Sequence, residues 1–199
     1  MHEVHPYGDR ALLVTELAAP AAFAMAVRDA RLPVLDVATG ADSVMVLLRH
    51  SNDVAATWAA LSRLSTNSEG TSRARQVEIP VAYDGADLGE VAAITGLAPQ
   101  KVIELHTSAE FIVAFCGFAP GFAYLTGLPK QLHVPRLTTP RTEVPAGAVA
   151  IAAEFSGVYP RRSPGGWRLL GTTSVELFNV DADPPALLTP GDRVRFVAQ

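Results

Sequence analysis

Arginine is the residue type in this sequence whose placement points most directly to chemistry. Arg136 and Arg141 each follow a proline, which stiffens the backbone just before the guanidinium group. A guanidinium group grips carboxylate or phosphate through two parallel hydrogen bonds. We therefore predict that both arginines stabilise negative charge during catalysis. The alternative role is a salt bridge to a neighbouring domain.

The charge around these arginines supports an anion as the ligand. From Lys130 to Arg168 the chain has six basic and two acidic residues, a net charge of +4, whereas the whole chain carries −4. The remainder therefore carries −8. Arg168 follows Trp167 and the pair Gly165-Gly166, whose backbone N–H groups could present a nest to an anion. The alternatives are solvated loop charges for the arginines and a plain tight turn for the glycines.

Aromatic and hydroxyl side chains complete the predicted binding site. The loop around Gly121 is expected to expose the rings of Phe118, Phe122 and Tyr124, which would line a pocket or an interface, with the barrel core as the alternative. His106 is the best acid or base by type, although a lone histidine at a helix end is usually structural. Cys116 is interpreted as a packing residue rather than a nucleophile. The predicted ligand-binding residues besides Arg168, Gly165 and Gly166 are Ser163, Tyr159, Phe118, Pro120, Gly121 and Tyr124.

Composition narrows the class of protein. The 199 residues are 49% hydrophobic and 18% charged, enough to bury a core, and the single cysteine favours a reducing, cytoplasmic compartment. No apolar run is long enough to span a bilayer, and the acidic balance argues against nucleic acid as a partner. The motifs GxxxxGK[ST], GxGxxG, HExxH and paired CxxC are absent, so no standalone nucleotide or metal site is predicted.

Hydrophobic periodicity predicts an α+β chain of two domains. The first, residues 1–83, has the βαββαβ order of a ferredoxin-like domain. Its predicted elements are strand 11–14, a helix from Pro20, strands 35–39 and 43–48, helix 54–61, a polar connection over 64–75 and strand 77–81.

The second predicted domain, residues 84–199, opens with two short helices. Asp87 precedes the first and Gly96 ends it, while Pro99 starts the second. Helix-turn-helix spacing is an alternative, but acidic residues dominate this region and would repel DNA. Eight of the 15 Gly and seven of the 15 Pro then fall between Gly117 and Gly171, which predicts short strands joined by tight turns. Residues 175–178 and 194–196 are predicted as further strands.

Three motifs in this region resemble the KipI/PxpB family, whose members are also known as allophanate hydrolase subunit 1 or as the B-type component of 5-oxoprolinase. The motifs are GFAPGFAYL at 117–125, PRTEVPAG at 140–147 and SPGGWRLLG at 163–171. The match extends to YGDRAL at 7–12 and PGDRV at 190–194, so it covers nearly the whole chain. The resemblance implies a ferredoxin-like domain followed by a cyclophilin-like β-barrel.

The resemblance also implies a function. The chain would be the PxpB-type component of a multi-subunit, ATP-dependent 5-oxoprolinase, which hydrolyses 5-oxo-L-proline, a small carboxylate, to L-glutamate. Its partners would be a second barrel subunit of the KipA/PxpC type and a PxpA-type subunit, and ATP would be shared with them. The chain has no complete catalytic set of its own, which suggests a shared site. One alternative is a KipI-like inhibitor that blocks autophosphorylation of a sensor histidine kinase. Another is a carboxyltransferase-type module of a urea carboxylase or allophanate hydrolase system.

Two turns depart from the family pattern. Residues 153–156 read Ala-Glu-Phe-Ser where many relatives have a Gly-Gly-Gln-Thr-like turn. Residues 172–174 read Thr-Thr-Ser where Arg-Thr-Pro is usual. An amide and an arginine that relatives place near a ligand are therefore absent here.

Overall fold

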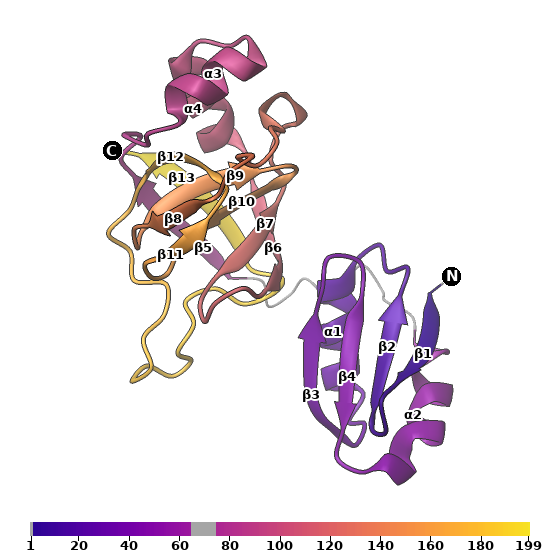
Figure 1. Ribbon diagram of the computed structural model, residues 1–199. Helices are drawn as coiled ribbons and strands as arrows, with labels where there is room; N and C mark the ends of the chain where they lie inside the picture. The colour runs from indigo at the N-terminus through magenta and orange to yellow at the C-terminus, as the bar shows by residue number, and fades with distance from the viewer. Residues whose placement is uncertain (1, 65–74) are drawn as a thin grey trace. The chain divides into compact units, whose positions relative to one another are not determined.

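The computed structural model describes residues 2–64 and 75–199 and divides the chain into two compact units, Met1–Ala74 and Arg75–Gln199 (Figure 1). The division falls before the strand predicted at 77–81, so that strand belongs to the second unit rather than to a first domain ending at residue 83. Most of the predicted polar connection, residues 65–74, lies outside the described residues.

The first unit is a four-stranded antiparallel sheet with two helices. Its strand order is β1-β2-β4-β3. The predicted split βαβ arrangement is present, because β2 and β3 are joined by α1 and β4 lies between them. The elements are β1 Glu3–Tyr7, β2 Ala11–Thr15, α1 Pro20–Asp29, β3 Val34–Thr39, β4 Val44–Leu48, a 3-10 turn at Ser51–Asp53 and α2 Val54–Leu61.

One of the two outer strands of this sheet is β1, which was not predicted from the sequence. It takes the place expected for strand 77–81, and this corrects the predicted order βαββαβ. A tight turn with Gly8 at φ +69° joins β1 to β2, and the two strands pair from Glu3 opposite Thr15 to Tyr7 opposite Ala11. A hairpin partner adjacent in sequence closes a shorter loop than a strand more than 60 residues away.

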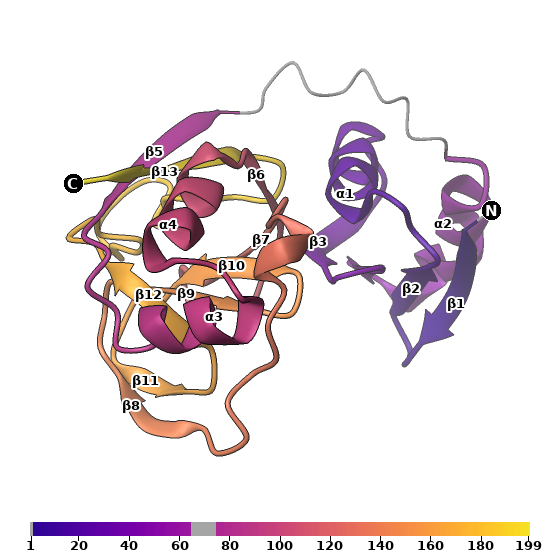
Figure 2. The same ribbon diagram turned by 90° about the horizontal axis from the view of Figure 1, so that it is seen from above.

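The helices of the first unit pack on one face of its sheet (Figure 2). Pro20 occupies the first turn of α1, where its missing N–H costs nothing. Phe23 and Val27, four residues apart on one helix face, are buried, and Leu61 of α2 joins the same core. Full burial of each such side chain is worth about 1.5–3 kcal/mol.

The second unit is built on a seven-stranded sheet of order β12-β9-β10-β7-β6-β13-β5, with the two-stranded sheet β11-β8 outside it (Figure 2). Its central pairs are antiparallel, but β5 and β13, the first and last strands of the unit, run parallel. The strands are β5 Gln76–Val81, β6 Phe111–Cys116, β7 Ala123–Thr126, β8 Arg141–Val144, β9 Ala148–Ala152, β10 Phe155–Val158, β11 Ser163–Gly165, β12 Arg168–Thr172 and β13 Arg193–Ala198.

A backbone bridge between Ala82 and Thr172 joins the two ends of this sheet and makes it a barrel. Two hydrogen bonds form the bridge, from Ala82 N to Thr172 O at 2.9 Å and from Thr172 N to Ala82 O at 2.8 Å. The approach is so close that a Cβ on Gly171 would clash with the Ala82 carbonyl oxygen. Glycine is therefore required at this seam.

Helices α3 Leu88–Thr95 and α4 Pro99–Ser108 cover one end of the barrel (Figure 1). Both were predicted, and Gly96 ends α3 in the left-handed conformation at φ +69°. Val91 and Val102 are fully buried against the barrel core. The predicted strand at 175–178 is wrong, because only an isolated bridge from Phe178 to Ala186 forms there.

The seam glycine can be tested by substitution. Gly171→Ala should lower the free energy of unfolding by about 3 kcal/mol, at the upper end of overpacking costs, because backbone atoms cannot move aside easily. Gly89→Ala in α3 is the matched control, since a Cβ there meets nothing within 4 Å. That control should stabilise the protein by about 0.5–1 kcal/mol. Urea unfolding measures both, and equal stability of Gly171→Ala and wild type would contradict the seam.

Candidate functional site

Strand β9 separates two packed layers of the second unit. Its Val149 and Ile151 side chains join the barrel core, whereas Ala148, Ala150 and Ala152 alternate to the other face. The small alanine side chains leave room for large rings. Phe122, Tyr159 and Trp167 fill that room and are buried with them.

Phe122 is the centre of this aromatic layer. Its ring meets those of Tyr159, Trp167 and Tyr124 edge to face, with centroids 5.3, 5.4 and 5.1 Å away. Such pairs favour fixed relative orientations over loose packing. Tyr124 is half-buried and also stacks on Phe115 at 4.2 Å. The predicted binding aromatics therefore do come together, with Phe122 and Tyr159 in the core of the layer.

Arg136 lies over this layer. Its guanidinium carbon is 5.8 Å from the centroid of the Trp167 ring, within cation–π range. No carboxylate among the described residues lies within ion-pair distance of Arg136, and the side chain is exposed. The backbone before it is anchored, because Arg168 Nε donates to the Pro135 carbonyl at 3.0 Å. The backbone before Arg136 is thus anchored, and its guanidinium has no carboxylate partner among the described residues.

Arg141 is already engaged by an acid of its own chain. Its Nη2 donates to Asp87 Oδ1 at 2.5 Å, and Asp87 is only 4% exposed. The other carboxylate oxygen of Asp87 accepts the Leu169 backbone N–H at 2.7 Å. The predicted role of Arg141 in stabilising negative charge during catalysis is not supported by this pairing. Its Nη1 is buried and has no hydrogen-bond partner in the described part of the chain.

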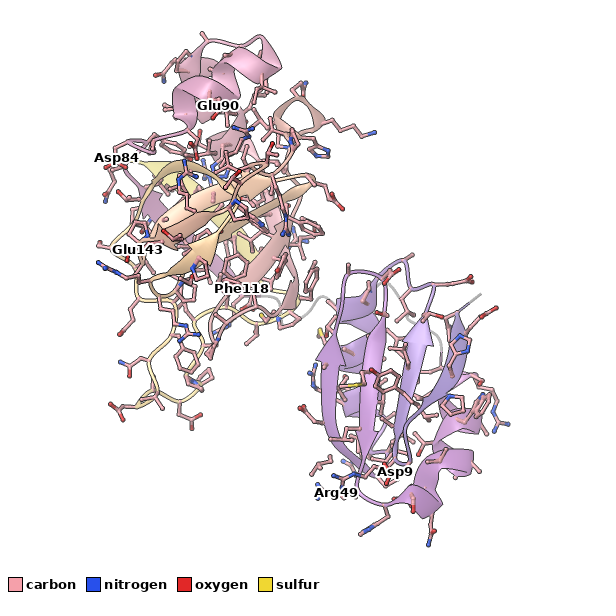
Figure 3. All side chains as sticks on the ribbon, in the orientation of Figure 1. Asp9, Arg49, Asp84, Glu90, Phe118 and Glu143 are labelled. Carbon is pink, nitrogen blue, oxygen red and sulfur yellow. The ribbon has the colours of Figure 1, made fainter. Side chains whose placement is uncertain are left out.

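Arg168 is also paired within the chain. It is 6% exposed, and its Nη1 lies 2.7 Å from Glu90 Oε2 in an ion pair that lacks hydrogen-bond alignment. Glu90 is on α3, near the helical end of the unit, whereas Phe118 lies toward the opposite end (Figure 3). Arg168 therefore ties β12 to α3, and the predicted ligand role is not supported by its position.

The Tyr159 side chain carries a hydroxyl group that feels the charges of Arg136 and Arg141. Burial raises its pKa, although the Trp167 backbone N–H and the guanidinium groups of Arg136 and Arg141 oppose the rise. Tyr159 therefore keeps its proton at neutral pH. A Cβ on Gly165 would clash with its oxygen, so a glycine there leaves space for the phenol.

The glycine pair does not form the predicted anion nest. A nest needs alternating backbone conformations of opposite hand, and neither Gly165 nor Gly166 has a positive φ. Gly165 pairs with Arg141 in the outer sheet, and the Gly166 carbonyl accepts the Leu137 N–H at 2.8 Å. Ser163 bonds the Arg161 carbonyl at 3.3 Å on the same outer sheet. These residues shape the site rather than bind through backbone donors.

Phe118 is the most exposed aromatic of the layer. It is 59% exposed and touches Phe122 and Tyr159 only edge on, at 5.3 and 6.2 Å. Pro120 and Gly121 belong to the loop that carries it, and a Cβ on Gly121 would lie 2.6 Å from Phe178 Cβ. The sequence therefore predicted the exposed ring correctly for Phe118 but not for the buried Phe122.

His106 is not at the site. It is fully buried and stacks on Phe196 at 4.5 Å, so the predicted role as catalytic acid or base is corrected. The Ser156 hydroxyl donates to the Ala150 carbonyl at 3.3 Å, which leaves its oxygen to accept from His106 Nε2 at 2.9 Å. His106 Nδ1 then accepts from the Tyr83 hydroxyl at 2.7 Å. Burial lowers the pKa of His106 to about 3, so it is a neutral core residue.

Two further kinds of reactive group that could offer chemistry are the Cys116 thiol and a metal site. Partial burial, helped by the Asp192 carboxylate, raises the pKa of the Cys116 thiol to about 11, so the thiolate is scarce at neutral pH. Over residues 2–64 and 75–199 no three His, Cys, Asp or Glu side chains are grouped to hold a metal ion. Within the same residues no helix is long and apolar enough to cross a membrane.

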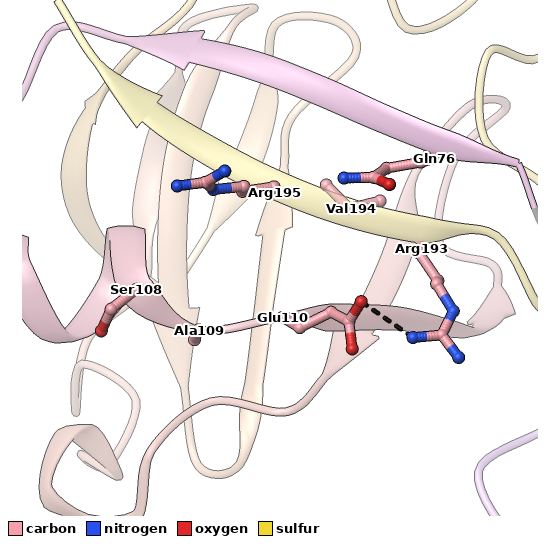
Figure 4. A pocket seen from close by; sticks show the side chains of 7 residues that line it. All are labelled: Gln76, Ser108, Ala109, Glu110, Arg193, Val194 and Arg195. Carbon is pink, nitrogen blue, oxygen red and sulfur yellow. Dashed lines mark ion pairs between the residues drawn. The ribbon is translucent and has the colours of Figure 1, made fainter.

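One hollow of about 220 Å³ lies elsewhere on the second unit (Figure 4). Its polar wall includes Arg193, which forms an ion pair with Glu110 at 2.8 Å, and Arg195. None of the predicted site residues lines it. The lining residues are Gln76, Ser108, Ala109, Glu110, Arg193, Val194 and Arg195.

Sequence reasoning missed the acids that organise the site. Asp87 was interpreted as the start of α3, and it occupies that position, but its carboxylate makes no capping bond and instead binds Arg141 and Leu169 N–H. Glu90 was counted only as negative charge. The available signal was the match between the acidic residues at and just before α3 and the basic stretch from Lys130 to Arg168.

The chain belongs to the family described as carboxyltransferase domain, subdomain C and D, whose model matches residues 2–188. Among curated proteins, the 5-oxoprolinase B component of Escherichia coli O157:H7 is 47% identical over 173 residues, which are 83% of this chain and 78% of that protein. The protein of the same name from Bacillus subtilis (strain 168) is 50% identical over 126 residues, which are 62% of this chain and 52% of that protein. The resemblance to the KipI/PxpB family is thereby confirmed.

Solved structures agree on the fold. The structure of TTHA0988 has a TM-score of 0.82 at 37% identity and covers 96% of this chain, which corresponds to only 40% of TTHA0988. Urea amidolyase of K. lactis has a TM-score of 0.75 at 18% identity, over 100% of this chain and 15% of that protein. At that identity the likeness concerns the fold alone, and it agrees with the predicted barrel.

The buried histidine predicts a pH dependence of stability. Because the pKa of His106 is about 3 when folded and 6.5 ordinarily, the unfolded chain binds one more proton between these values. The free energy of unfolding should therefore fall as pH drops below 6.5, by up to about 1.4 kcal/mol per pH unit from this residue. His106→Gln should flatten the fall between pH 6.5 and 5 in urea unfolding. The exposed-site control His50→Gln should keep it, and an unchanged slope in His106→Gln would refute the assignment.

Proposed function

We propose that this chain is the B component of a multi-subunit 5-oxoprolinase, which converts 5-oxo-L-proline, ATP and water to L-glutamate, ADP and phosphate. Three curated relatives at 45–50% identity, each named as the B component of 5-oxoprolinase, support the proposal. The structural observation that carries it is Arg136, a guanidinium with no acid partner among the described residues, held over Trp167.

A small carboxylate suits the exposed guanidinium of Arg136, which would bind it through two parallel hydrogen bonds. The Trp167 ring under Arg136 and the Phe122 ring packed against Trp167 are only 4% and 2% exposed, so they support the guanidinium and offer a substrate little apolar area. Tyr159 is 2% exposed, so its protonated hydroxyl also supports the site from inside the domain. Arg136 would bind and orient the substrate but supplies neither a base nor a nucleophile.

The residues of this chain do not fit a nucleotide by themselves. The sequence has no phosphate-binding loop, and the glycine pair at 165–166 lacks the backbone conformation of a nest. Arg141 and Arg168 already neutralise Asp87 and Glu90. We therefore assign ATP, which would supply activation of the lactam carbonyl, to the partner subunits of the KipA/PxpC and PxpA types.

Substitution of Arg136 tests the substrate role. In a complex reconstituted with both partner subunits, Arg136→Gln should lower kcat/KM for ATP-dependent glutamate formation from 5-oxoproline by about 10²–10³, the effect of losing one preorganised charge-stabilising group. The control Arg162→Gln removes an exposed arginine paired with Glu143 and should stay within about threefold. Equal activity of Arg136→Gln and wild type would overturn the role of Arg136.

The function itself is tested by leaving this chain out. Hydrolysis that continues without it would refute the proposal. Inhibition of a sensor histidine kinase's autophosphorylation by the isolated chain would favour the KipI-like alternative. Carboxyl transfer to or from urea in place of glutamate formation would favour the urea carboxylase alternative.

A further inference from the structure

Phe118 combines exposure with an unfavourable backbone conformation. Its φ is +69°, in the left-handed region that bulky residues avoid, and its ring is 59% exposed. An exposed ring gains little from burial, so the folded chain does not recover the conformational cost through this side chain. Such strain is retained where the conformation serves function.

The loop holds Phe118 rigidly in this position. Gly117 N donates to the Phe122 carbonyl at 3.1 Å, and Phe122 N donates to the Ala119 carbonyl at 3.0 Å, so the loop is closed by backbone hydrogen bonds. Gly121, at φ +81°, presses against Phe178 and Leu177, where any Cβ would clash. The ring is therefore presented in one conformation before any partner arrives, which reduces the entropy lost on binding.

An arginine without a carboxylate partner among the described residues lies close in sequence to a residue that contacts the Phe118 ring. Phe118 meets Tyr159 edge on, and Tyr159 lies within the electrostatic influence of Arg136. Arg161, two residues after Tyr159, is exposed and, like Arg136, has no carboxylate of the described residues within ion-pair distance. Phe118 and Arg161 together are called the Phe118 surface below. Aromatic residues and arginine are the residue types that dominate binding energy at protein interfaces.

We propose that the Phe118 surface is where the second barrel subunit docks, with Phe118 inserted into an apolar pocket of that subunit that has a carboxylate at its rim. The proposal rests on the proposed function, which requires such a subunit. The match to TTHA0988, of which this chain covers 40%, supports a larger assembly, since more than half of that polypeptide lies beyond the matched part. Arg161, which has no carboxylate of the described residues within ion-pair distance, favours an acidic group on the partner.

Phe118→Asn tests the proposal cleanly. Asparagine tolerates the left-handed conformation, so the variant removes the ring but keeps the loop. With the full chain and the purified second barrel subunit, calorimetry should show a Kd raised at least about 30-fold, the effect expected of an interface hot spot. The melting temperature of the isolated variant should be equal to or above that of wild type. Ile94→Asn, which removes an equally apolar residue that is 47% exposed on α3, should leave Kd within about threefold.

Each other outcome has a defined meaning. An unchanged Kd for Phe118→Asn, or no complex between the wild-type chain and the second barrel subunit, would overturn the docking proposal. Weakened self-association of the isolated variant with an unchanged Kd for that partner would assign the surface to a second copy and would also overturn it. A complex that depends on Phe118 but hydrolyses no 5-oxoproline would uphold docking and refute the proposed function. Full 5-oxoprolinase activity together with normal partner binding by Phe118→Asn would refute docking through Phe118 and uphold the proposed function.

Discussion

One buried carboxylate, that of Asp87, connects three parts of the second unit. It binds the Arg141 guanidinium from the outer sheet and the Leu169 N–H from the barrel strand β12, and it stands at the first residue before α3. The Asp87 N–H also donates to the Leu169 carbonyl at 3.0 Å, next to the seam that closes the barrel. A buried charge is tolerated only when it is paired and hydrogen-bonded, so these three elements must keep their positions together.

The proposed site follows from this constraint. With Arg141 held by Asp87, and with Arg168 paired to Glu90 while bonding the Pro135 carbonyl, Arg136 is left as the free cation over the aromatic layer. The alternating alanines of β9 make that layer possible because they leave space for the rings of Tyr159 and Trp167. Within the positive stretch from Lys130 to Arg168, Arg141 and Arg168 are thus internal structure, and Arg162 is paired with Glu143 at the surface. Arg136 is the guanidinium over Trp167 that has no carboxylate partner among the described residues.

Local sequence patterns predicted most helices and strands, but they did not predict which residues far apart in the sequence pair with each other. Proline at the first position of α1 and glycine after α3 marked helix ends because these residues act through their own backbone. The strand at 76–81 was predicted in place but assigned to the wrong sheet, since periodicity does not say which strand pairs with β13. Arg141 and His106 were misjudged for the same reason, because their partners Asp87 and Ser156 lie 54 and 50 residues away. The exposure of Phe118 was predicted correctly because glycine and proline shape its loop locally, whereas the catalytic role of Arg136 stays a prediction.

The coupling between Asp87 and Arg141 is the most direct measure of this account. A double-mutant cycle of Asp87→Asn and Arg141→Met, followed by urea unfolding, isolates their interaction from the effect of each substitution. The account predicts that Arg141→Met loses about 3–5 kcal/mol, since it leaves the buried Asp87 carboxylate without its charged partner. Asp87→Asn should lose less, because the Arg141 side chain is 29% exposed and is partly solvated. It further predicts a coupling free energy of at least about 2 kcal/mol. Additive losses, with no coupling, would contradict the role given to this carboxylate.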